Sequence, residues 1–76
     1  MLITVHKFEI KAAMDQYKEF LAGRTGGFTA GLFELISQAD IGNKRKLALA
    51  FPAHVYVYMH LAGELDQINY IVKEIE

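Results

Sequence analysis

The sequence predicts an all-α fold: one domain of four or five short helices, with a short strand or extended arm at the N-terminus. Apolar residues recur at the spacing of an amphipathic helix over most of the chain. Glycines and the single proline fall between these apolar stripes, where helices end and begin. With 76 residues, the chain is long enough for only one domain.

The first half of the chain contains two predicted helices, which follow a strand-like stretch at residues 2–5. The first helix begins at Lys7, and we expect Gly23 to end it in the left-handed conformation. The second helix is predicted over residues 28–39. Gly31 lies inside this helix at a cost of about 1 kcal/mol relative to Ala, so we expect another backbone to approach closely there.

The second half of the chain is less regular. Asp40 can cap a third helix over residues 41–51. Residues 53–62 leave two alternatives open, because their apolar residues alternate as in a strand and also recur at helical spacing after Pro52. Residues 64–76 are predicted as a final helix, whose apolar face contains Leu65, Ile68, Ile71, Val72 and Ile75.

Composition excludes several classes of protein. The chain is 53% hydrophobic with a net charge of -1, which is atypical of disordered segments and of dedicated nucleic-acid binders. It has no cysteine, which excludes a disulfide scaffold and thiolate zinc sites. No apolar run is long enough to cross a membrane, and His6 and Lys7 interrupt the N-terminal apolar stretch, so we expect no membrane association and no signal peptide.

The chain has more apolar side chains than a domain of this size can bury. Such small domains bury only roughly 60% of the surface that the unfolded chain exposes. We therefore expect an apolar surface patch, and with it a homo-oligomer or a complex with another protein. The alternative is a well-packed monomer with exposed tyrosine hydroxyls. The surplus includes Tyr17, Tyr56, Tyr58, Tyr70, Met59 and Phe33.

One aromatic segment is a candidate protein-binding surface. In a strand, Tyr56, Tyr58 and His60 would share one face, whereas in a helix Tyr56 and His60 would be neighbours four residues apart. Tyrosine is enriched where proteins meet. The predicted protein-interaction residues are therefore Tyr56, Tyr58, Met59 and His60, and the alternative for them is packing in the core.

A glycine-rich loop is a candidate anion or nucleotide site. Glycines let backbone N–H groups turn toward an anion, and the following helix adds its positive N-terminal end. The guanidinium of Arg24 and the basic triplet Lys44-Arg45-Lys46 would add positive charge. The alternative is an ordinary turn between two helices, with the triplet solvated. The candidate residues are Arg24, Thr25, Gly26, Gly27, Lys44 and Arg45.

The sequence predicts neither an enzyme nor a metal or cofactor site. His6, His54 and His60 lack the spacing that places two imidazoles on one helix face. Ser37 is the only serine, and no histidine is near it in the sequence. The carboxylates of Glu64 and Asp66 are expected to be solvated.

One pattern spans residues 27–52 and consists of Gly27-Phe28-Thr29, Leu32-Phe33, Ile36, Ala39-Asp40, Asn43-Lys44, Lys46-Leu47-Ala48 and Phe51-Pro52. This pattern resembles small, largely uncharacterised proteins encoded by bacteriophages and related mobile elements. The resemblance implies a helical domain, a helix after Pro52 and a phage or prophage origin, and it brings no catalytic or binding residues. After Pro52 those relatives tend to be acidic, whereas residues 53–58 here are largely apolar and aromatic.

These observations predict a small phage-encoded accessory factor that binds a host or phage protein. It would act in the cytoplasm of the bacterial host as a homo-oligomer, and inhibit a defence or takeover target by covering part of its surface. The alternative is an oligomeric protein that sequesters a small nucleotide through the glycine-rich loop and the basic residues. Nucleic-acid binding is not expected, because basic residues do not exceed acidic ones.

Overall fold

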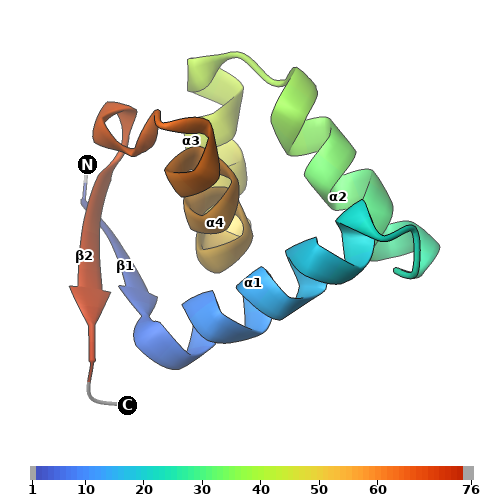
Figure 1. Cartoon of the computed structure of the whole chain (residues 1–76). Helices are drawn as coiled ribbons and strands as arrows, with labels where there is room; N and C mark the ends of the chain where they lie inside the picture. Colours follow the sequence, from blue (N-terminus) through green and yellow to red (C-terminus); the bar gives the residue numbers. More distant parts are fainter. Residues whose placement is uncertain (1, 75–76) are drawn as a thin grey trace.

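The structure is a computed structural model that describes residues 2–74. Four helices make up most of the structure, and a small sheet places its N-terminal and C-terminal segments side by side (Figure 1). The predicted fold class is therefore right in outline, and the N-terminal strand is confirmed. The elements in chain order are β1 (Leu2–His6), α1 (Lys7–Leu21), α2 (Gly27–Gln38), α3 (Ile41–Ala50), α4 (Pro52–Ala62), the 3₁₀ helix η1 (Leu65–Gln67) and β2 (Asn69–Lys73).

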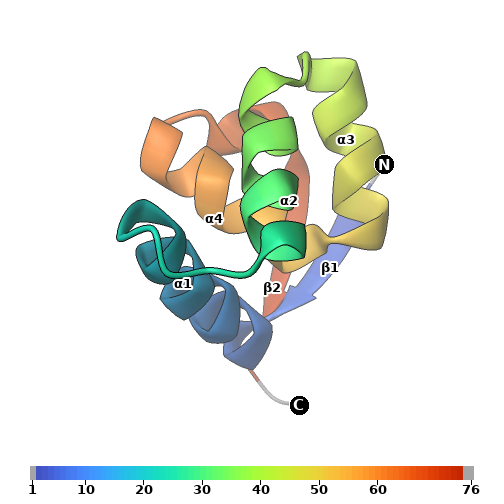
Figure 2. The same ribbon diagram turned by 90° about the vertical axis from the view of Figure 1, so that its right-hand side faces the viewer.

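Helix α4 lies at the centre of the fold and contacts α1, α2, α3 and β1 (Figure 2). Pro52 opens this helix, and Gly63 ends it with a φ of 73°, where glycine is favoured. A helix covered on several sides buries residues around its whole circumference. The alternating apolar residues of 53–62 would also fit a strand, but here they are buried on different sides of a helix. Of the two alternatives for residues 53–62, the helix is therefore the correct one. The buried residues of α4 are Ala53, Val55, Val57 and Met59.

The core is built around Phe33 of α2, which is buried. Its ring contacts Tyr17 of α1 edge-on at a centroid distance of 4.8 Å, and Phe20 and His54 at 5.5 and 5.4 Å. A second buried cluster joins Val5 of β1 to α1 and α4. These contacts fasten α1, α2, α4 and the sheet to one another.

Strands β1 and β2 pair in parallel, with Ile3 opposite Tyr70 and Val5 opposite Val72. Parallel neighbours need a crossover connection, and here the connection contains all four helices. Ile3 and Val5 are buried, whereas Thr4 faces outward. β1 packs on α1 and α4, while β2 packs mainly on β1. β2 is therefore the outer strand of the sheet (Figure 1).

The prediction of a final helix over residues 64–76 is wrong for the described part of that range. The chain forms η1 and then β2. Tyr70, Ile71 and Val72 are residue types that favour strands, and β1 offers them backbone partners. The C-terminal end of the predicted helix, with Ile75, lies outside the described residues.

The turns between helices follow local sequence signals. Gly23 has a φ of 75°, which confirms the predicted left-handed end of α1. Asp40 accepts a hydrogen bond on Oδ1 from the backbone N–H of Asn43 at 2.8 Å, which confirms the predicted cap of α3. The expectation for Gly31 is wrong, because a Cβ added there would meet no atom within 4 Å. This glycine faces open space on α2.

Candidate functional site

The four predicted protein-binding residues of α4 do not form one surface. Met59 is fully buried in the core, so its side chain cannot contact a partner, and the prediction is wrong for this residue. Tyr56 and His60 share a face, with nearly parallel rings at a centroid distance of 6.2 Å. Tyr58 points elsewhere, and its ring lies 5.4 Å from Nζ of Lys44. Only His60 is largely exposed, while both tyrosines are half-buried.

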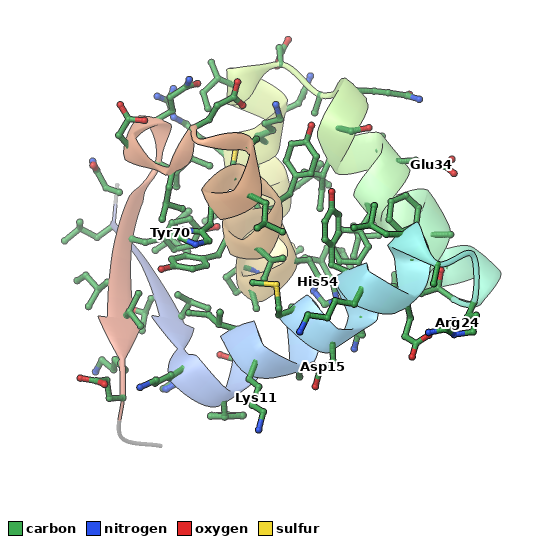
Figure 3. All side chains as sticks on the ribbon, viewed as in Figure 1. Lys11, Asp15, Arg24, Glu34, His54 and Tyr70 are labelled. Atoms are coloured by element: carbon green, nitrogen blue, oxygen red, sulfur yellow. The ribbon has the colours of Figure 1, made fainter. Side chains whose placement is uncertain are left out.

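Tyr70 of β2, which the sequence placed only among the surplus apolar residues, fastens the sheet to the helices. Its hydroxyl donates a hydrogen bond to the carbonyl oxygen of Pro52 at 2.9 Å, and Tyr56 packs edge-on against its ring at 5.1 Å. Burial, together with the neighbouring Tyr56, raises the pKa of Tyr70 well above its usual range, so the hydroxyl stays a donor. Figure 3 shows Tyr70 on the side of α4 that faces the sheet.

Replacing Tyr70 by phenylalanine removes this donor and leaves the ring in place. We expect the free energy of unfolding to fall by about 1 kcal/mol, the usual contribution of such a hydrogen bond. Urea denaturation followed by circular dichroism measures the change. An unchanged denaturation midpoint would show that the hydrogen bond does not hold β2 to α4 in solution.

The glycine-rich loop does not have the charge pattern of an anion site. Nε of Arg24 pairs with Oε2 of Glu19 at 2.6 Å, so an added anion would compete with this carboxylate for the guanidinium. The hollow beside the loop, about 280 Å³, is also lined by the carboxylate of Asp15. Two carboxylates in the same hollow repel an added phosphate. Thr25 lines this hollow, Gly26 precedes α2 and Gly27 begins it.

The basic triplet lies at the other end of α2 from this loop (Figure 1). Nζ of Lys44 lies 3.7 Å from Oε1 of Glu64, and Nη2 of Arg45 donates to the carbonyl oxygen of Gln67 at 3.1 Å. Both side chains therefore tie α3 to the segment before β2. The predicted joint site of Arg24 with Lys44 and Arg45 is wrong, because the fold keeps the two groups apart.

His54 lies inside an aromatic environment. Its ring packs beside Phe33 and Phe51, and its Nε2 lies 2.7 Å from Oε1 of Gln16, within hydrogen-bonding distance. Burial lowers the pKa of His54, because the imidazolium would lose solvation there. Figure 3 shows His54 between α4 and α1. Among residues 2–74, no three groups that could bind a metal come together, and no helix is long and apolar enough to cross a membrane.

The lowered pKa of His54 predicts that acid weakens the fold. In the unfolded chain His54 takes up a proton as the pH falls through its ordinary pKa of 6.5, while in the folded chain it resists protonation until a lower pH. The contribution of His54 to the free energy of unfolding should therefore have its full value above pH 6.5 and decrease as the pH falls below 6.5. Urea denaturation at a series of pH values tests this, and the decrease should be smaller in His54→Gln. Equal pH dependence in both proteins would contradict it.

The structure exposes an apolar surface that the sequence alone did not identify. Phe28 of α2 packs its ring against Phe51 at 5.8 Å, next to two hollows that share Ala50. One hollow, about 270 Å³, lies toward Phe8 of α1, and the other, about 450 Å³, lies between α2 and α3 and is lined by Leu35. We call this region the Phe51 surface; it consists of Phe8, Phe28, Leu35, Leu47, Ala50 and Phe51.

The Phe51 surface carries little charge. Glu9 lines the hollow near Phe8, and its Oε1 accepts the backbone N–H of His6 at 3.1 Å. Lys46 lines the hollow between α2 and α3, and no ion pair found among residues 2–74 includes it. The surface therefore presents apolar side chains with one acidic and one basic side chain at its border.

Comparison with protein families, with curated proteins and with solved structures finds no match to this chain.

Proposed function

We propose that this domain functions by binding another protein through the Phe51 surface, and not by catalysis. One observation carries the proposal: large exposed apolar side chains lie at or next to two hollows that share Ala50. Phe28 is 72% exposed and Leu35 is 52% exposed, although both belong to the apolar stripe of α2. Contiguous apolar surface of this kind usually mediates contact with another protein.

The shape of the surface fits an amphipathic helix of the partner. The hollow between α2 and α3 is lined by residues of both helices, and a groove between two helices is where a docked helix places apolar side chains at i, i+3 and i+4 spacing. Gly31 lies between Phe28 and Leu35 along α2 and leaves open space for close approach. The ammonium of Lys46 on the rim favours an acidic residue in the docked helix.

The nature of the partner follows from the resemblance of residues 27–52 to small phage-encoded proteins. We propose on that ground that the partner is a host or phage protein, and that covering its surface inhibits it. The segment that carries the resemblance contains α2, α3 and Phe51, which form most of the proposed docking surface.

Affinity capture from a bacterial lysate, followed by mass spectrometry, tests the proposal. Leu35→Asp and Phe28→Asp should lose a partner that the natural domain retains. Leu61→Asp is the matched control, because Leu61 is 53% exposed and lies at the opposite end of α4 from Phe51. If all four baits retain the same proteins, or the natural bait retains none that Leu35→Asp loses, binding through the Phe51 surface is contradicted.

A thermal-shift series with nucleotides tests the alternative of a nucleotide-sequestering protein. A ligand that binds only the folded state raises the melting temperature by mass action. Because Glu19 already pairs with Arg24, we expect no rise with nucleotides. A rise that disappears in Arg24→Ala would support nucleotide binding instead.

A further inference from the structure

The outer edge of β2 is available for pairing. The sheet contains only two strands within residues 2–74, and β2 has β1 on one side only. Isolated two-stranded sheets are marginal in water, and parallel sheets are normally covered. Proteins usually protect an edge strand with proline, bulges or inward-pointing charges. β2 has no proline, and its one charged residue is Lys73 at the end of the strand.

The sequence of β2 is complementary to itself in an antiparallel arrangement. With a two-fold axis at Ile71, Tyr70 lies opposite Val72 of the second copy, and Lys73 lies opposite Asn69 of the second copy. Aromatic and β-branched residues pair favourably across strands, and like charges directly opposite each other are unfavourable. The antiparallel arrangement places Lys73 beside an amide and keeps like charges apart.

We propose that β2 pairs with β2 of a second copy of this chain, and that the dimer contains one four-stranded sheet in the order β1-β2-β2-β1. An in-register parallel arrangement would set Lys73 beside Lys73, with like charges directly opposite each other. The antiparallel two-fold contact closes on itself, as most homodimer contacts do. A second copy in this arrangement therefore pairs the free edge of β2 and also keeps the two Lys73 side chains apart.

The proposed dimer contact is separate from the Phe51 surface. β2 lies on one side of the molecule and α2 on the other (Figure 1). A two-fold axis perpendicular to the sheet also keeps the helices of both copies on the same face. Dimerisation and partner binding can therefore fail independently, and each has its own variants.

Cysteine cross-linking locates the two-fold axis, because the natural chain has no cysteine. Directly opposite residues of antiparallel strands have Cα atoms about 4.5 to 5.5 Å apart, within the range that a disulfide spans. In oxidised glutathione, Ile71→Cys should become mostly disulfide-linked dimer. Leu2→Cys should stay mostly uncross-linked, although Leu2 is 65% exposed and Ile71 only 41%. If Leu2→Cys cross-links as fast as Ile71→Cys, the proposed pairing is wrong.

A charge-reversal experiment tests the same contact without cross-linking. Light scattering over a micromolar concentration series should show the natural chain as a dimer. Ile71→Lys places two ammonium groups at the axis and should raise the dissociation constant at least about tenfold. Leu2→Lys, on β1 and therefore outside the proposed β2–β2 contact, should leave it unchanged. Mixing Ile71→Lys with Ile71→Glu should restore a dimer, which also shows that both variants fold.

Three results would overturn the proposal. The first is that the natural chain stays monomeric throughout the concentration series. The second is that Ile71→Lys dimerises as tightly as the natural chain, and the third is that the mixture of oppositely charged variants stays monomeric. If β2 instead pairs with a strand of another protein, the natural chain should stay monomeric and should capture a protein that Ile71→Lys does not capture.

Discussion

Replacing Phe33 by alanine is expected to lower the free energy of unfolding by about 3 to 5 kcal/mol. Phe33 is buried, and its ring contacts Tyr17, Phe20 and His54 on two other helices. Alanine would leave a cavity where α1, α2 and α4 meet. Without a disulfide, a domain this small has only about 3 to 5 kcal/mol to lose. We therefore expect circular dichroism at 25 °C to show a largely unfolded chain.

Leu35→Ala is the control on the same helix. Leu35 is exposed on the Phe51 surface, and exposed substitutions usually change stability by about 0.5 kcal/mol or less. This variant should stay folded and lose partner capture. If Leu35→Ala unfolds the protein as far as Phe33→Ala does, Leu35 belongs to the core and the docking surface is misplaced.

Replacing Val5 by aspartate is expected to cost about 4 kcal/mol or more, because it buries a carboxylate without a partner. Val5 is fully buried and joins β1 to α1 and α4. The neighbouring Thr4 faces outward, so Thr4→Asp should stay folded. Urea denaturation of the two variants compares the two faces of β1 directly. Similar losses in both would contradict the described orientation of the strand.

Helices α1, α2 and α3 could be predicted because their signals are local. The apolar period, Gly23 at one helix end and Asp40 at the next helix start all act within a few residues. β2 could not be predicted in this way, because its backbone partner Leu2 lies 67 residues before Asn69 (69 minus 2). The apolar spacing of residues 64–76 fits a helix equally well, so only the presence of the partner strand β1 decides between a helix and a strand.

The candidate surface was harder to predict than the helices, because exposure depends on what covers a helix. Leu32 and Ile36 are buried while Phe28 and Leu35 are exposed, although all four belong to one apolar stripe. Helix α4 shows the opposite error. Met59 was a predicted contact residue and is buried, because α4 lies at the centre of the fold.

The parallel pairing of β1 with β2 has a consequence for biosynthesis. The ribosome makes β1 before the four helices and β2 after them, so β1 stays without its strand partner while the helices emerge. Pairing between residues so far apart in sequence is slow to form, because a long loop must close first. During translation the backbone groups of β1 that pair with β2 thus stay unpaired, and open to chaperones and proteases, until β2 is released.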